Sequence, residues 1–408
     1  MVWPVEQPEF GAHIRSLRQA RGLSQAEVAG SAMSISYLSR IESGARPPTA
    51  KTIDYLSERL GVPVAALSSP PANPLLKLIA LITSGDLDDA TVARLRDAVA
   101  DDDIEPEVRW QGYWLLADAL ARRGLLAQER EVLRSVDELG DTIKVPELSA
   151  RVCTRLARCE RSLGNVAEAH LLAQRALQTA QDNALAVPDI ARPLMILISA
   201  EAELGRLPKA RELADRLTEL VAGTSGVLRV EALWTTAQVS MRQGDIAAAR
   251  QAIESALDVL SSHDDLMLWL RVRLAAASLY LQVSPADPAA AARRLDEAEP
   301  AVQLIGRPLH DEEFRLLRAA VAFEQGDLPT AQALCDRLED SHEHLTFRDQ
   351  IRLGVLANRL RIMAGDRETG IANISELAQR TQEAMNIDLT AEIWRTLAET
   401  LAATPPAR

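Results

Sequence analysis

The sequence predicts an all-α protein in which a small helical domain precedes a long array of helical repeats. Three observations lead to this prediction. Only 3% of the 408 residues are aromatic although 47% are hydrophobic, and the abundant Ala and Leu are strong helix formers. Capping residues delimit short amphipathic helices in the first 70 residues. Beyond them, glycines recur at intervals of about 40 residues, which is typical of a repeat architecture.

The charge of the chain is unevenly distributed. The net charge is −13, but residues 1–70 carry seven Lys/Arg against six Asp/Glu, and residues 71–408 carry 38 against 52. An even spread of acidic residues would argue against binding nucleic acid, because phosphate contacts need local Lys and Arg. The acidic excess lies in the second region, so the first domain remains a candidate for binding DNA.

The cysteines and the hydropathy pattern indicate where in the cell the protein is located. Cys153, Cys159 and Cys335 have no metal-ligand spacing, so we expect buried packing residues in a reducing environment. No apolar run approaches about 20 residues, and no basic stretch followed by an apolar segment opens the chain. We therefore expect a cytoplasmic protein without a membrane span.

Four helices are expected in the first domain. The first ends at Gly22, and the second starts at Gln25, because Ser24 and Glu27 form a capping box. Ser34 caps a third helix over residues 35–42, and Thr49 caps a fourth. The predicted core consists of the apolar side chains spaced along these helices and just after them: Phe10, Ile14, Leu17, Leu38, Ile41, Ile53, Leu56, Leu60, Val62, Val64 and Leu67.

The run LRQARGLSQAEVA followed by SISYLSRIESGARPPT resembles the Xre, or lambda-repressor-like, helix-turn-helix family over residues 8 to 68. The resemblance implies that the third helix enters the major groove of DNA. Base-facing positions are then occupied by Ser34, Ile35, Ser36 and Arg40, with Tyr37 at their edge. Arg40 would pair with guanine and Ile35 would touch a thymine methyl group.

The same resemblance assigns further roles in this domain. Gln25 and Arg46 match positions that contact phosphates, and Arg18 and Glu42 match a buried ion pair between the first and third helices. The alternative is a helical module that has lost DNA binding and serves as a docking domain.

A repeat region follows the linker Ser-Ser-Pro-Pro-Ala-Asn-Pro at residues 68–74. Its glycines are separated by 40, 41, 39, 82 and 39 residues, and the long interval spans two periods with a disrupted junction near Ser284-Pro285. They are Gly124, Gly164, Gly205, Gly244, Gly326 and Gly365. Small residues recur at fixed distances from them, an arrangement that resembles the tetratricopeptide repeat, in which a glycine lies in the turn between two antiparallel helices.

The period predicts the domain organisation. Because it exceeds the about 34 residues of standard repeats, we expect longer helices. We expect seven helical pairs over residues 104–383, a less regular segment at 74–103 and a final capping helix near 388–402. The predicted domains are 1–68, which binds DNA, 69–103, a linker with leading helices, and 104–408, a superhelical repeat domain for sensing and dimerisation.

The first helix of each repeat should face the concave groove of the superhelix. Counting back from the turn glycines predicts these groove positions: Gln111, Trp114, Asp118, Arg151, Arg155, Arg158, Arg192, Trp234, Gln238 and Arg271. Guanidinium groups bind carboxylates and amides bind a peptide backbone, which suits an anionic or C-terminally anchored peptide. Alternatively, the arginines form a solvated face that pairs with Glu147 and Glu160, and the tryptophans pack between helices.

The combination of the two domains is similar to the peptide-pheromone receptor regulators of the RRNPP type. It implies a homodimeric transcriptional regulator that recognises a specific DNA operator and responds to a peptide or protein effector. The alternative is a protein-interaction scaffold or antitoxin-like component with an auxiliary helix-turn-helix. No phosphate-binding loop, nucleophile elbow or metal-ligand spacing is present, so we expect neither an enzyme nor a cofactor or metal site.

Overall fold

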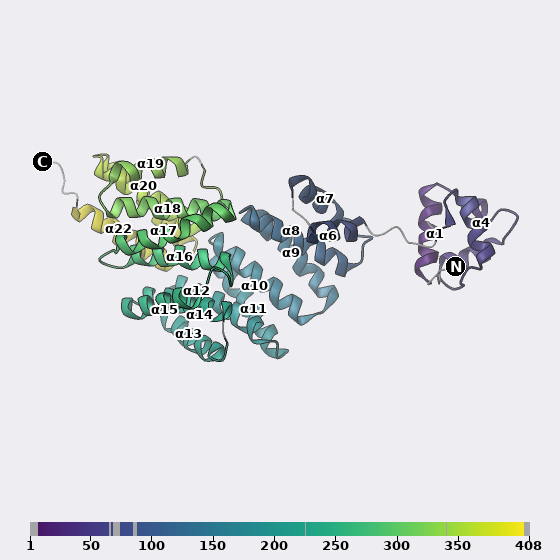
Figure 1. Ribbon diagram of the computed structural model, residues 1–408, viewed down its shortest axis with the longest axis horizontal. Helices are drawn as coiled ribbons and strands as arrows, with labels where there is room; N and C mark the ends of the chain where they lie inside the picture. Colours follow the sequence, from purple (N-terminus) through teal and green to yellow (C-terminus); the bar gives the residue numbers. More distant parts are fainter. Residues whose placement is uncertain are drawn as a thin grey trace. The chain divides into compact units, whose positions relative to one another are not determined.

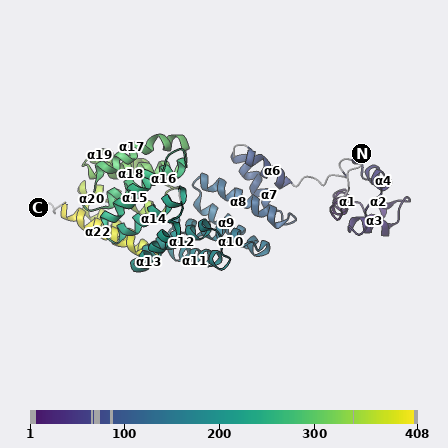
Figure 2. The ribbon, with the colours of Figure 1, turned by 60° about the horizontal axis from the view of Figure 1, so that its bottom comes forward.

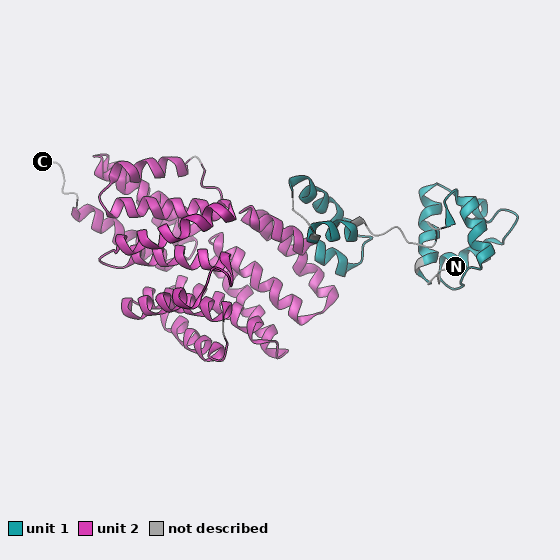
Figure 3. Cartoon of the chain, viewed as in Figure 1, with its two compact units in different colours: residues 1–112 teal, residues 113–408 magenta. Residues whose placement is uncertain are grey.

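The computed structural model describes residues 7–64, 67, 74–84, 88–224, 226–339 and 341–403. All regular secondary structure in these residues is helical, which confirms the all-α prediction. The chain divides into two compact units, residues 1–112 and 113–408 (Figure 3). The predicted linker at 68–74 lies outside the described residues apart from Pro74, and the domain boundaries near residues 68 and 103 stay a prediction.

The first four helices are short (Figure 1), and side chains cap the starts of the second, third and fourth. They are α1 (Glu9–Ala20), α2 (Gln25–Ala29), α3 (Ile35–Glu42) and α4 (Ala50–Leu60). Ser24 and Glu27 form the complete capping box before α2. The Ser34 and Thr49 side chains each accept a bond from the backbone N–H three residues on, at the starts of α3 and α4. The predicted starts of α2, α3 and α4 are confirmed.

These four helices enclose a small apolar core. The predicted core residues are buried or packed at its edge, with one exception. Val64 is 41% exposed, so its prediction is wrong. Val62 and Leu67 turn inward after α4, and Val64, between them, lies on the solvent side. A Cβ at Gly11 would lie 2.0 Å from the Ile41 carbonyl oxygen, so α1 can cross α3 closely only with glycine there.

Two further helices in the first unit form a separate pair, α6 (Pro74–Ser84) and α7 (Asp89–Val99). Asp88 caps α7 by accepting a bond from the Thr91 N–H at 2.7 Å. Their contact buries one apolar face of each helix, made of Leu75, Leu78, Ile82, Val92, Leu95 and Val99. This pair is the irregular segment that the sequence predicts before the repeats.

The repeat region consists of seven pairs of helices and one final helix, as predicted (Figure 1). The first helices of the pairs are α8 (Pro106–Arg122), α10 (Pro146–Ser162), α12 (Val187–Glu203), α14 (Val227–Arg242), α16 (Leu266–Gln282), α18 (Pro308–Glu324) and α20 (Phe347–Met363). The second helices are α9 (Leu126–Ile143), α11 (Val166–Asp182), α13 (Leu207–Val221), α15 (Ile246–Val259), α17 (Pro288–Ile305), α19 (Leu328–Glu339) and α21 (Arg367–Glu383). The final helix is α22 (Ile387–Ala403).

The turn glycines occur where the sequence predicts them. All six have positive φ, from 72° at Gly124 to 106° at Gly365, a region that is open to glycine and costly for other residues. The pair α16 and α17 lacks this glycine, and Asp287 caps α17 instead. Most of the helices have 17 residues, which accounts for a period longer than that of standard repeats.

Alternate helices of the second unit form one continuous wall. From α10 to α22, each first helix contacts the first helix of the next repeat, and the second helices pack outside them. The stack curls so far that α22 contacts α12, although four complete helical pairs lie between the α12–α13 pair and α22 in sequence (Figures 1 and 2). The wall therefore encloses a groove, and the residues that face it come mainly from the first helices.

Two further expectations concern the burial of the cysteines and the presence of a membrane-spanning helix. Cys153, Cys159 and Cys335 are free thiols and are buried, which confirms their prediction as packing residues. Among the helices that the structure describes, none is both long enough and apolar enough to cross a membrane.

Candidate functional site

The outer face of α3 carries the predicted base-facing side chains. Ser34, Ser36 and Arg40 are exposed, and Ile35 is 52% exposed although it is apolar. Within the described residues, no carboxylate lies within ion-pair distance of Arg40. An exposed isoleucine beside hydroxyl groups and an unpaired guanidinium is a face that is open to a partner.

Beneath this face, an ion pair joins α1 to α3. The Arg18 guanidinium donates to both Glu42 carboxylate oxygens at 2.7 and 3.0 Å, and it also donates to the Leu23 carbonyl at 2.8 Å. The Gln25 amide donates to the same carboxylate at 2.8 Å. Burial opposes ionisation of Glu42, but the bonds from Arg18 and Gln25 hold its pKa below the ordinary value. The carboxylate thus fixes three elements together.

Tyr37 and Arg46 lie at one edge of the α3 face. Tyr37 is half-buried against the domain core, with its hydroxyl 3.4 Å from the Thr52 hydroxyl of α4. The Arg46 guanidinium lies 5.0 Å from the centre of the Tyr37 ring, within the range of a cation–π contact. Tyr37 is therefore partly a packing residue that supports Arg46, rather than an outward-facing side chain alone. The roles of Gln25 and Arg46 toward phosphate stay predictions.

The second unit contains a large cavity in its groove. Its volume is about 1230 Å³, and α8, α10, α12, α14, α16, α18, α20 and α22 supply most of its lining. The predicted groove residues on this lining are Trp114, Asp118, Arg151, Arg155, Arg158, Arg192, Trp234, Gln238 and Arg271. Gln111 is exposed and does not line the cavity. Trp114 and Asp118 on the same helix do line it, so the cavity reaches only the later turns of α8.

The cavity is positively charged although the protein is acidic. Twelve arginines and nine carboxylates line it, whereas the whole chain has a net charge of −13. Most of these arginines are neutralised by carboxylates of other helices. Arg151 donates to Asp189 at 2.8 and 3.1 Å, and Arg155 donates to Glu129 at 2.9 Å and to Asp118.

These pairs differ from the solvated face that the sequence left open. Arg151 is bonded to Asp189 of the next repeat, and Glu160 binds Arg134 at 3.0 Å on a different helix. Two tryptophans of the cavity lining contact arginines: Arg155 lies 4.8 Å from the Trp114 ring centre, and Arg271 lies 4.9 Å from that of Trp234. Both rings also pack against the apolar core, so packing and support of the arginines are combined.

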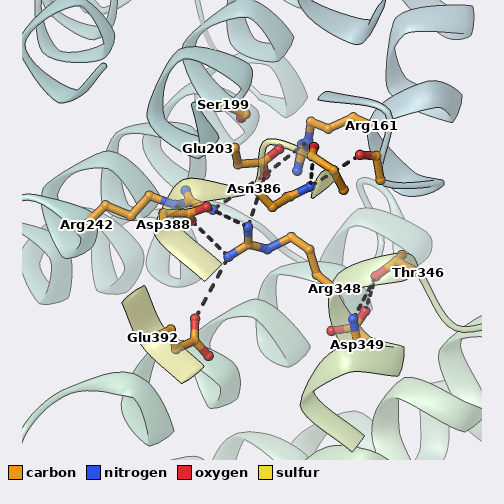
Figure 4. Close-up of polar contacts among 12 residues, drawn as sticks. Arg161, Ser199, Glu203, Arg242, Thr346, Arg348, Asp349, Asn386, Asp388 and Glu392 are labelled. Atoms are coloured by element: carbon orange, nitrogen blue, oxygen red, sulfur yellow. Dashed lines mark hydrogen bonds and ion pairs between the residues drawn. The ribbon is translucent and has the colours of Figure 1, made fainter. Parts of the chain in front are cut away.

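A charged network in the cavity lining joins distant repeats (Figure 4). Arg348 of α20 extends toward Asp388 of α22, to which it donates two bonds at 3.0 and 2.9 Å. Arg242 of α14 donates to the same carboxylate at 2.7 Å. Glu203 is fully buried and lies 3.5 Å from Arg161 and 3.6 Å from Arg242. The network therefore connects α10, α12, α14, α20 and α22.

Sequence reasoning missed this network. Its members lie in different repeats, and no spacing or motif marks them as neighbours. They meet because the superhelix makes enough of a turn to bring α22 against α12. Within the described residues, no group of three His, Cys, Asp or Glu side chains is arranged to hold a metal ion.

Two family models match the chain. Residues 9–69 match a helix-turn-helix domain, and residues 154–226 and 197–264 match tetratricopeptide repeats. The chain carries a helix-turn-helix domain followed by tetratricopeptide repeats. The architecture inferred from the sequence is therefore confirmed. No curated protein matches this sequence significantly.

Two solved structures share the overall fold of this chain, and a third aligns less well. The Rap conjugation gene regulator of plasmid pLS20, in complex with the Phr* peptide, aligns with 98% of this chain and 99% of its own at 11% identity, with a TM-score of 0.55. A Rap protein complexed with Competence and Sporulation Factor aligns with 97% of this chain and 96% of its own at 13% identity, with a TM-score of 0.54. PlcR of Bacillus thuringiensis, in complex with the peptide PapR7 and DNA, aligns with 75% of this chain and 98% of its own at 14% identity, but its TM-score of 0.41 is too low to establish a common overall fold.

Proposed function

We propose that this protein is a homodimeric, cytoplasmic transcriptional regulator that binds a DNA operator through α3 and a peptide effector in the groove of its repeats. The observation that carries the proposal is the pairing of two open surfaces in one chain. One is the exposed face of α3 in a helix-turn-helix domain, and the other is the cavity of about 1230 Å³ in the repeats.

The chemistry of α3 supports the DNA-binding part. Arg40 can donate two bonds to the major-groove edge of guanine, and Ile35 can contact a thymine methyl group. Arg46 follows α3 and is exposed, so it can reach a phosphate. The first 70 residues have a net charge of only +1, so we expect two domains on half-sites about 34 Å apart to be needed for tight binding.

The cavity supports the effector-binding part. Its volume exceeds the usual range for a site that binds a small molecule, and its lining mixes aromatic rings, amides and guanidinium groups. The two Rap proteins that share the fold were solved with a peptide and with Competence and Sporulation Factor. A peptide held in this groove would contact several repeats at once, so it could change their curvature and the spacing of the two DNA-binding domains.

A second candidate function is a protein-interaction scaffold, or an antitoxin-like component, in which the helix-turn-helix domain is auxiliary. The low positive charge of the first 70 residues favours it. The two functions make different demands on α3, since only the regulator needs Arg40.

The test is capture of genomic DNA fragments by purified full-length protein, compared with Arg40→Ala over a series of salt concentrations. Lys77→Ala is the matched control, because Lys77 is an exposed cation on α6, outside the helix-turn-helix domain. We expect one palindromic motif to be enriched by the wild type and by Lys77→Ala and to be lost with Arg40→Ala. Equal enrichment by Arg40→Ala would instead favour the scaffold.

A further inference from the structure

Among the described residues, four arginines of the cavity lining have no carboxylate oxygen within 4.0 Å: Arg122, Arg158, Arg271 and Arg307. Two of them, Arg158 of α10 and Arg271 of α16, line the cavity from different repeats. Among the described residues, no carboxylate oxygen lies within 4.0 Å of either guanidinium, whereas Arg151, Arg155 and Arg161 on α10 each have such a partner. Both are therefore cations of the cavity that no carboxylate of the described residues contacts directly.

The surroundings of the two side chains differ. The Trp234 ring lies beneath the Arg271 guanidinium at 4.9 Å, and Gln238 lines the cavity one helical turn after Trp234. Beside Arg158, the guanidinium of Arg155 is fixed by Glu129 and Asp118, so those carboxylates are already engaged. The contact with Trp234 orients the Arg271 guanidinium before any ligand enters, which reduces the entropy lost on binding.

The electrostatics of the pair point to a negatively charged ligand. Arg158 is exposed to the groove, but the surrounding protein withholds water from its guanidinium and so lowers its pKa. Loss of water in the groove also lowers the pKa of Arg271, and the charge of Arg158 lowers it further, so the two guanidinium groups repel each other, while Glu231 and Glu313 partly offset this repulsion. An anion bound to both would remove this repulsion and replace the water that each cation gives up in the groove.

We propose that Arg158 and Arg271 together bind a carboxylate of the effector, which makes the effector an anionic peptide. The proposal rests on the function proposed above. The carboxylate has two possible sources, the C-terminus of the peptide or an Asp or Glu side chain. Guanidinium groups recognise both by the same pair of N–H to O bonds.

The test uses four pools of short random peptides, immobilised through an N-terminal biotin and exposed to the purified full-length protein. The pools combine a free or amidated C-terminus with the presence or absence of Asp and Glu. We expect a pool with either kind of carboxylate to bind at least about tenfold more tightly than the neutral amidated pool, because a charge-assisted bond contributes more than a neutral one. The two single-carboxylate pools then identify its source.

Three variants connect the preference to this pair. Arg158→Gln and Arg271→Gln should each reduce the preference about tenfold, and Arg158→Lys should retain part of it through its charge. Arg216→Gln is the matched control, because Arg216 is exposed on α13 and does not line the cavity. It should bind all pools as the wild type does. Circular dichroism of each variant verifies that it is folded.

The outcomes separate this inference from the proposed function. Binding of all pools with equal affinity would overturn the carboxylate site and leave a peptide-binding regulator intact. A preference that persists in Arg158→Gln and Arg271→Gln would also overturn the site, because the carboxylate would then bind elsewhere. Binding of no pool would overturn both the site and the peptide-sensing role, and DNA capture by the same preparations would still report on operator binding.

Discussion

The Asn386 side-chain amide donates a hydrogen bond of 3.2 Å to the backbone carbonyl of Gly164, a residue 222 positions away in the chain. Gly164 lies in the turn between α10 and α11, and Asn386 directly precedes α22. The turn glycine of one repeat is thus a docking point for the end of the chain. This contact, together with the network around Asp388, holds the superhelix in a closed form (Figure 4).

Substitution of Gly164 should test how closely Phe347 of α20 packs against this turn. In Gly164→Ala, the new Cβ would lie 2.6 Å from an atom of the Phe347 ring at a residue with φ of 90°. Gly244→Ala is the matched control, because its φ is 79° and no atom lies within 4 Å of the new Cβ. We expect Gly244→Ala to lower the free energy of unfolding by about 1–2 kcal/mol through strain alone. Gly164→Ala should lose about 1–3 kcal/mol more, measured by urea denaturation, and equal losses would contradict the close packing of Phe347.

The Arg348 side chain should be necessary for closure. Arg348→Met leaves Asp388 with Arg242 as its remaining partner and removes one of the cations near Glu203. Loss of one partner from a buried ion pair costs about 3–5 kcal/mol of stability. Hydrogen exchange should also accelerate in α22. If Arg348→Met unfolds at the same urea concentration as the wild type, the network does not stabilise the closed form.

Acid should weaken the same network. Although burial opposes ionisation, Arg348 and Arg242 hold the pKa of Asp388 well below its usual range. The charged form is therefore stabilised by folding, and its contribution is complete above the unfolded pKa of about 3.9 and lost as the pH falls toward the folded value. We expect the stability difference between the wild type and Asp388→Asn to be constant from pH 7 to 5 and to shrink below about pH 4. A difference that grows on acidification would contradict this assignment.

Substitution of Arg18 should lower the stability of the helix-turn-helix domain, whereas substitution of Arg40 should abolish its DNA binding. Arg18→Met leaves the buried carboxylate of Glu42 with only the Gln25 amide, so we expect a loss of about 3–5 kcal/mol from this domain. Arg40→Ala removes an exposed side chain and should change stability by less than about 0.5 kcal/mol while abolishing motif enrichment. Thermal unfolding of residues 1–112 within the full-length protein, followed by hydrogen exchange, separates the two effects.

The three cysteines should be unreactive in the native protein. Burial raises the pKa of Cys159 and of Cys335 to about 12, and burial also raises that of Cys153. The thiolate is the reactive form, so at pH 8 a thiol reagent should modify none of them rapidly. In urea, all three should react. Rapid reaction of one thiol without denaturant would show that its helix opens locally.

The sequence by itself determined the local structure of this protein. Helix starts follow from Ser24, Ser34 and Thr49, because an N-cap bond joins residues only three positions apart. The repeat period follows from the turn glycines, because a positive φ restricts the residue at that position. Most of the groove positions follow from the same glycines, because the distance from a turn sets the face of a helix.

Only the tertiary structure decided which charges meet. The partners of Arg155, Arg242 and Arg348 come from other helices, at separations that depend on the curvature of the whole stack. Each repeat adds a small rotation, and the sum over the stack places α22 against α12. No local pattern encodes that sum. For this reason the sequence predicted a row of groove arginines, and only the fold showed which of them carboxylates hold and that Arg158 and Arg271 have no carboxylate within 4.0 Å among the described residues.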